Sequence, residues 1–90
     1  MTYSIKGDPD YLIARGQRLY ELAAEIERQL NTLDNTVSPL RWTFIGKRAG
    51  SFFTQYDQLK GQMYGLRDVV NSFAGQLTES GNKLKSVDRA

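Results

Sequence analysis

An apolar heptad repeat runs along almost the whole chain and breaks once, at a proline and a tryptophan. It alternates steps of four and three, and only Gly16 and Ser80 in it lack an apolar or aromatic side chain. The members are Leu12, Gly16, Leu19, Ala23, Ile26, Leu30, Leu33 and Val37, then Ile45, Ala49, Phe52, Tyr56, Leu59, Met63, Leu66, Val70, Phe73, Leu77, Ser80, Leu84 and Val87. A spacing averaging three and a half residues places such side chains on one side of an α-helix and favours a left-handed supercoil. The sequence therefore predicts two long helices.

The break between the two runs predicts a single helical hairpin domain over residues 1–90. We expect a first helix over about 9–36, a turn over about 37–46 and a second helix over about 46–87. At about 1.5 Å per residue these helices form a rod, in which each apolar seam is covered on one side only. The predicted fold is therefore all-α: two long antiparallel helices in a helix-turn-helix hairpin that assembles into a four-helix bundle dimer.

The predicted helix ends rest on capping residues. Asp8-Pro9 suits a helix start, because Asp8 accepts from free amides and proline fits the first helical position. The second helix starts after either Pro39 or Gly46, and the later start places two cations at the positive end of the helix dipole. It ends near Gly81 or continues to Val87. Residues 1–8 are expected to be extended, with Tyr3 and Ile5 alternating with polar neighbours.

The predicted dimer seam takes its side chains from both runs. It consists of Leu19, Ile26, Leu30, Phe52, Tyr56, Leu59, Met63, Leu66, Val70 and Phe73. Lys60 is expected on a flank of the seam, where its replacement changes little. A second stripe on the second helix holds only small residues, namely Gly46, Gly50, Thr54, Asp57, Gly61, Gly65, Asp68, Ser72 and Gly75. That stripe is either a solvent face or a groove in which another backbone approaches closely.

Composition excludes several classes of function. The chain has no cysteine and no histidine, which removes disulfides, thiolate metal sites, thiol nucleophiles and the usual neutral-pH general base. A net charge of +2 is too small to indicate nucleic-acid binding. No apolar stretch has the length of a membrane span or of a signal-peptide core. We expect no enzymatic activity, no metal and no cofactor, and no export by the general secretory route.

Trp42, Gly46, Ala49 and Phe52 carry a resemblance to a known family. A tryptophan in the turn of a hairpin of this size resembles the Trp-x-Gly (WXG, ESAT-like) family of type VII secretion substrates, in which alanine and an aromatic residue follow the glycine by three and six positions. The chain departs from the motif, since three residues separate Trp42 from Gly46 where the family has one. The resemblance implies a small secreted protein that first folds and pairs in the cytoplasm and presents a composite signal near Trp42 and Gly46 to a secretion ATPase.

The family's export signal, Tyr-x-x-x-Asp/Glu, normally lies near the C-terminus. The sole match here, Tyr64 to Asp68, lies in mid-helix and is either a chance helical pair or a displaced signal. A chain without the signal resembles the partner subunit of a heterodimer. Homodimer, heterodimer with a related small helical protein, and pairing with the helical domain of an LXG-type toxin all stay open. The pattern from Phe53 to Asp57 resembles the small helical partners of such toxins.

Two features of the turn have alternative interpretations. Trp42 is either a plug that packs against apolar neighbours at the end of the hairpin or a recognition element. Arg41, Lys47 and Arg48 are either solvated or meet an acidic partner surface. A plain structural coiled coil is the competing function, although such a coil has no need of a tryptophan at its turn.

Overall fold

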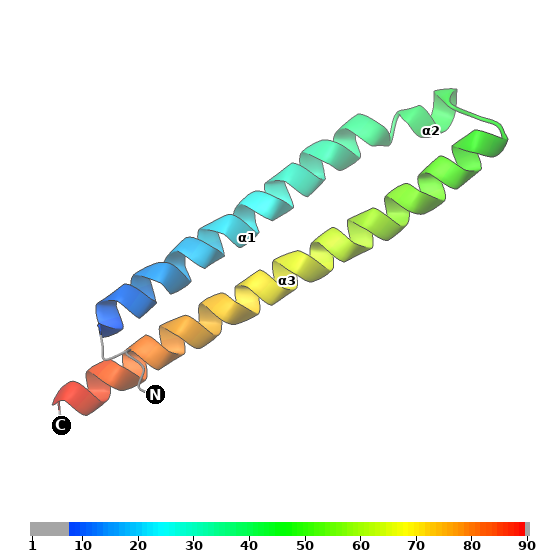
Figure 1. Cartoon of the computed structure of the whole chain (residues 1–90). Helices are drawn as coiled ribbons and strands as arrows, with labels where there is room; N and C mark the ends of the chain where they lie inside the picture. The colour runs from blue at the N-terminus through cyan, green and yellow to red at the C-terminus, as the bar shows by residue number, and fades with distance from the viewer. Residues whose placement is uncertain (1–7, 90) are drawn as a thin grey trace.

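The chain forms a rod made of two antiparallel helices joined at one end (Figure 1). A computed structural model describes the backbone of residues 8–89 and the side chains of residues 8–86. Helix α1 spans Pro9–Val37, the single turn α2 spans Leu40–Thr43, and α3 spans Lys47–Arg89. The principal extents are 66, 25 and 14 Å, and the radius of gyration is 19.8 Å. A globule of this length has a radius of gyration of about 12 Å, so the described chain has one layer of helix contacts and no enclosed core.

Helix α1 starts as its capping residues predict. Asp8 is the N-cap and its Oδ1 accepts from the amide of Tyr11 at 3.3 Å, with Pro9 in the first helical position. The helix ends at Val37, where the amide of Ser38 donates to the carbonyl of Asp34 at 2.8 Å. Residues 1–7, including the expected extended strip with Tyr3 and Ile5, lie outside the described residues.

The contact between α1 and α3 uses one half of the heptad pattern. Among the described side chains, the buried apolar ones are Ala23, Leu30, Val37, Ala49 and Tyr56 from the repeat, together with Ala74, which follows Phe73 and lies outside the repeat. Leu30 is 1% exposed and Tyr56 is 6% exposed, so both members of the predicted dimer seam are already covered within the chain. Two helices can bury only the side chains that face each other, so the other members of the repeat stay exposed or half-buried.

The other half of the pattern stays uncovered on α3. Phe52, Leu59, Leu66 and Phe73 recur every seven residues and are exposed, Leu66 by 47% and Phe73 by 54%. We call these four residues the exposed column. Leu19, Ile26, Met63 and Val70 are half-buried. Each protomer therefore presents a long apolar strip along the rod.

The two helices approach each other closely near the open end of the hairpin, at two glycines. A Cβ atom on Gly16 would clash with the Thr78 hydroxyl, and one on Gly81 would lie 2.6 Å from Cγ1 of Ile13 and 2.8 Å from the carbonyl of Pro9. Gly81 does not end the helix, because α3 runs through it to Arg89. Its missing side chain lets α1 pack there.

The small-residue stripe of α3 faces open space over most of its length. A Cβ atom on Gly50, Gly61 or Gly65 would meet nothing within 4 Å, whereas Gly75 has the Tyr20 hydroxyl at 3.4 Å. The close approach therefore occurs at Gly16 and Gly81, outside the predicted stripe. Within the single chain, this stripe is a solvent face.

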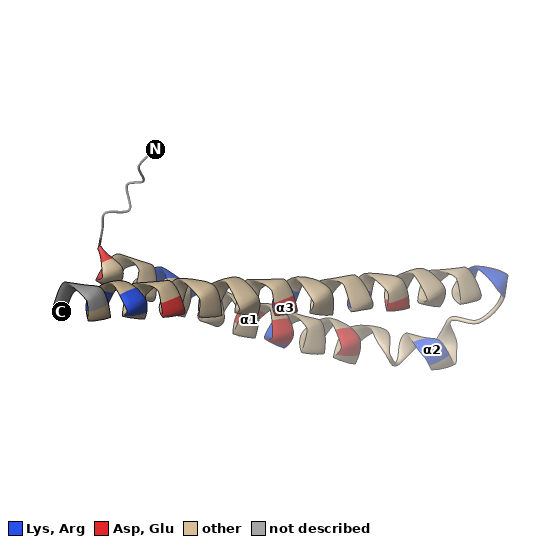
Figure 2. Cartoon of the chain, turned by 90° about the horizontal axis from the view of Figure 1, so that it is seen from below, with Lys and Arg blue, Asp and Glu red and all other residues tan. Residues whose placement is uncertain are grey.

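Ion pairs join the two helices along the rod, and Figure 2 shows acidic and basic residues distributed along both. Lys85 pairs with Asp10 at 2.8 Å, and Arg67 pairs with Glu27 at 3.2 Å. Lys60 lies at the flank of this contact and pairs across it: its Nζ lies 3.0 Å from Oδ1 of Asp34 on α1. No helix in the described part of the chain is long and apolar enough to cross a membrane.

Candidate functional site

The closed end of the hairpin, residues 38–50, is built from a short helical turn followed by a sharp reversal. We call this segment the tip. The turn α2 starts after Pro39, where the amides of Arg41 and Trp42 donate to the carbonyls of Ser38 and Pro39 at 3.1 and 3.2 Å. Phe44 is extended, with φ −100° and ψ 102°, and it ends α2. The chain is thus helical after Pro39 and again after Gly46, so each predicted start corresponds to a separate helix.

Gly46 makes the reversal into α3. Its φ of +110° lies in a region that side-chain-bearing residues rarely adopt. Its carbonyl accepts from the amide of Gly50 at 3.2 Å, which closes the first turn of α3. Lys47 is the first residue of α3, which has no acidic residue in its first turn. The cations weaken the helix start by about 0.3–1 kcal/mol each, and burial of Ala49 against the rest of the hairpin opposes that loss.

Trp42 projects into solvent and is 85% exposed. The plug interpretation is therefore wrong for the single chain, because a plug would lie buried against its neighbours. A cluster of three phenylalanines packs at this end instead. The ring centroids of Phe44 and Phe52 lie 5.7 Å apart, and those of Phe52 and Phe53 lie 5.0 Å apart in an edge-to-face arrangement. Trp42 is therefore accessible to a partner, while the three phenylalanines of the tip pack against one another.

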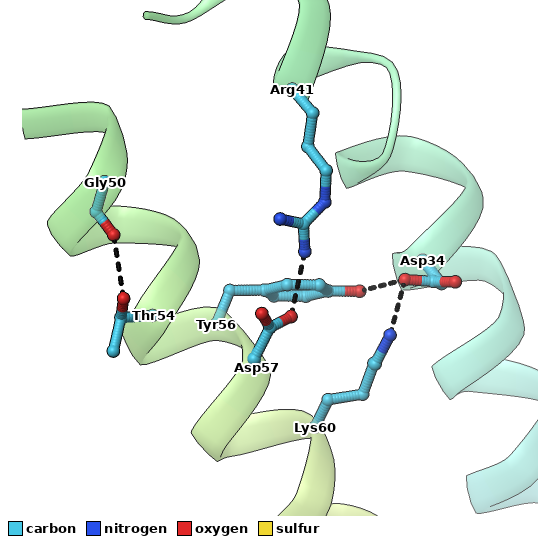
Figure 3. A network of polar contacts seen from close by, with 7 residues as sticks. All are labelled: Asp34, Arg41, Gly50, Thr54, Tyr56, Asp57 and Lys60. Carbon is cyan, nitrogen blue, oxygen red and sulfur yellow. Dashed lines mark hydrogen bonds and ion pairs between the residues drawn. The ribbon is translucent and has the colours of Figure 1, made fainter. Parts of the chain in front are cut away.

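Arg41 holds the tip onto α3 (Figure 3). Its Nη2 donates to Oδ1 of Asp57 at 2.8 Å, and its Cζ lies 4.5 Å from the centroid of the Phe53 ring. The guanidinium thereby combines an ion pair with a cation–π contact. Since Arg41 directly precedes Trp42, this contact fixes the position of the turn that carries the tryptophan. The Phe53–Asp57 pair of the toxin-partner pattern is thus engaged within the chain.

Polar side chains of α1 and α3 bond to each other next to the tip. The hydroxyl of Tyr56 donates to Oδ1 of Asp34 at 2.8 Å, and the same oxygen accepts from Nζ of Lys60 at 3.0 Å (Figure 3). Burial, together with the hydrogen bond to the carboxylate, raises the pKa of Tyr56 to about 12. The hydrogen bonds from Lys60 and Tyr56 lower the pKa of Asp34. These hydrogen bonds form at only one register of α3 against α1, so they fix the position of the tip relative to the long helices.

The Tyr64 and Asp68 pair lies far from the tip, in the middle of α3. Arg67 lies between them: its Cζ is 5.0 Å from the centroid of the Tyr64 ring, and its Nη2 donates to Oδ1 of Asp68 at 2.9 Å. The bond to Asp68 raises the pKa of Arg67. The chain does not bring this pair together with Trp42 and Gly46 into one surface. Among the side chains of residues 8–86, no group of three potential ligands could hold a metal ion.

Sequence reasoning missed three participants in this region. Asp34, Lys60 and the pairing of Arg41 with Asp57 were not predicted as functional. Arg41 and Asp57 lie sixteen residues apart in the sequence, and Asp34 and Lys60 lie twenty-six apart. The only available signal was the position of Asp34 and Lys60 next to the predicted seam, where polar side chains are unusual.

Comparison with known proteins gives three consistent matches. The model of the family WXG100, described as proteins of 100 residues with WXG, matches residues 4–89. Protein YukE of Bacillus subtilis (strain 168) is 27% identical over 89 residues, covering 99% of this chain and 92% of YukE. A crystal structure of EsxA from Geobacillus thermodenitrificans superposes with a TM-score of 0.83 at 20% identity, covering 99% and 96% of the two chains. The last match confirms the hairpin fold predicted from the heptad repeat.

Proposed function

Because the chain belongs to the WXG100 family, of proteins of 100 residues with WXG, we propose that it is a small non-enzymatic substrate or partner subunit of a type VII secretion system. In this proposal it folds and pairs in the cytoplasm and is then exported by a route other than the general secretory one. Export depends on a composite surface that includes Trp42 and Gly46 and is recognised by the secretion ATPase.

The exposure of Trp42 carries this proposal. Trp42 is 85% exposed, so its large apolar side chain is not buried in the protein interior. It therefore does not stabilise the isolated hairpin. The turn that carries it is held against α3 by Arg41, which contacts Asp57 and Phe53. An exposed aromatic side chain on such an anchored turn is typical of the anchor residues at protein interfaces.

The exposed column supports pairing of two hairpins. This column is an apolar strip that is exposed to solvent in the single chain; it consists of Phe52, Leu59, Leu66 and Phe73. Packing of a second hairpin against this strip would complete a four-helix bundle with the half-buried side chains Leu19, Ile26, Met63 and Val70 in its core. Both a homodimer and a heterodimer with a related small helical protein fit such a strip.

A toxin helical domain as the partner gains no support from the tip. Phe53 and Asp57, which resemble a toxin-partner pattern, both contact Arg41 within the chain. Tyr64 and Asp68 likewise have an internal partner in Arg67. We therefore place the recognition surface of this protein at the tip.

A secretion assay tests the proposed function. The tagged chain is expressed in a host with a type VII system and in the same host lacking the secretion ATPase. We expect it in the culture medium of the first strain and only inside the cells of the second. Equal amounts in both media would show that the chain leaves by another route or by lysis, and a cytoplasmic marker protein distinguishes these two cases.

A further inference from the structure

The tip concentrates positive charge next to uncovered apolar side chains. No acidic residue occurs between Asp34 and Asp57, whereas Arg41, Lys47 and Arg48 lie in that interval. The chain has a net charge of +2, so its excess of positive charge comes from this segment. Figure 2 shows basic residues on α2 and on the first turn of α3 at this end of the rod.

Two of the three cations are free of internal partners. Arg41 is paired with Asp57 at 2.8 Å. Among the described side chains, no carboxylate lies within ion-pair distance of Lys47 or Arg48, and both are exposed. They also lie at the positive end of the α3 dipole, where cations are unfavourable for the helix itself. Their arrangement is therefore not explained by the stability of the hairpin.

Ile45 adds a second uncovered apolar side chain to the tip. It is 77% exposed, follows Trp42 by three residues and directly precedes the reversal at Gly46. Trp42 and Ile45 thus offer two uncovered apolar side chains immediately before Lys47 and Arg48. An apolar pair bordered by cations matches a protein surface with an apolar pocket and a rim of carboxylates.

From this arrangement we infer that Ile45, Lys47 and Arg48 complete a docking surface with Trp42, and that the partner is an apolar pocket with an acidic rim on the export machinery. The inference rests on the proposed function and names the chemistry of the recognising surface. A membrane is a poorer match, because three cations near an anionic surface contribute only about 3 kcal/mol.

Charge reversal tests this inference without loss of the fold. The double variant Lys47→Glu, Arg48→Glu places acids at the positive end of the α3 dipole, so its melting temperature should equal or exceed that of the wild type. Export should fall about tenfold or more, because like charges would then face each other across the contact. The matched control, Arg15→Glu with Arg18→Glu, makes the same charge change on α1 and should leave export unchanged.

Two further variants separate charge from shape. Exchange of the two cations, Lys47→Arg with Arg48→Lys, should keep export at the wild-type level. Ile45→Ser should reduce export without a change in melting temperature, since Ile45 is already exposed to water. Wild-type export of the charge-reversal variant would overturn the inference and leave the proposed function intact. Absence of wild-type export would overturn both.

The same experiments would reveal two other binding partners of the tip, a second copy of the chain or a membrane. If charge reversal dissociates the dimer in sedimentation equilibrium, the tip contacts a second copy and the inference is wrong. Trp42 is the single tryptophan of the chain, so its fluorescence reports on the tip alone. A blue shift on addition of phosphatidylglycerol vesicles, reversed by high salt, would identify a membrane as the occupant and would also overturn the inference.

Discussion

The guanidinium of Arg41 donates to the carboxylate of Asp57 at 2.8 Å, and this ion pair ties the tryptophan-bearing turn α2 to the second long helix. An exposed ion pair contributes only about 0–1 kcal/mol, so its main effect is on position. We predict that Asp57→Asn leaves the melting temperature nearly unchanged but lowers the fluorescence anisotropy of Trp42. Glu79→Gln, which removes the exposed Lys83–Glu79 pair at the other end of the rod, is the control and should leave the anisotropy unchanged.

The buried Tyr56 predicts a loss of stability at high pH. Its pKa is raised to about 12 in the folded chain from about 10 in the unfolded one, so between these values the folded state binds more protons. Stability from this group is therefore fully present below pH 10 and is lost as the pH rises towards 12. Thermal melts across this range should show a steeper fall for the wild type than for Tyr56→Phe, and parallel curves would contradict the burial of the hydroxyl.

The two halves of the heptad predict different consequences for two leucines. Leu30→Ala removes a side chain that is 1% exposed and should destabilise the hairpin by about 2–5 kcal/mol in chemical denaturation. Leu66→Ala should instead weaken association by a similar amount, roughly 2–5 kcal/mol, if a second hairpin covers the exposed column. Sedimentation equilibrium at micromolar concentration should find the wild type dimeric and Leu66→Ala more dissociated. A monomeric, cooperatively melting wild type would refute the pairing.

Two glycines of α3 predict opposite effects of the same substitution. Gly65→Ala should raise the free energy of unfolding by about 0.5–1 kcal/mol, because alanine favours the helix and the added Cβ meets open space. Gly81→Ala should lower it by roughly 1–3 kcal/mol, because the Cβ forces Ile13 and the backbone of Pro9 away. Denaturant titrations of the two variants check the prediction. Stabilisation by Gly81→Ala would mean that the helices are farther apart at this end than described.

The heptad spacing and the capping residues were sufficient to predict the hairpin, because both are local signals of helix geometry. The spacing did not distinguish the side chains between the helices from those facing outward. Leu30 and Leu66 belong to the two alternating halves of the pattern, which look alike in sequence, yet one is buried and the other half-exposed. That difference depends on the rotation of α3 about its axis, which long-range contacts such as Tyr56 with Asp34 define.

The tip was predicted only in part. The tryptophan and Gly46 were identifiable as turn residues from their types and from the interruption of the repeat. The role of Arg41 was not, because its partner Asp57 lies sixteen residues further along the chain, in a different element. The exposure of Trp42 also required the structure, since a tryptophan in a segment that also holds Phe44, Phe52 and Phe53 is more often packed among such rings.

Thermal melting and secretion of Trp42→Ala, measured on the same variant, test whether Trp42 is recognised during export. We expect an unchanged melting temperature, because the side chain is 85% exposed, unchanged association, and loss of export by the type VII system. Phe53→Ala serves as the comparison, since it removes a packed ring of the tip and should lower the melting temperature. Export of Trp42→Ala at the wild-type level would contradict the claim that this tryptophan is recognised.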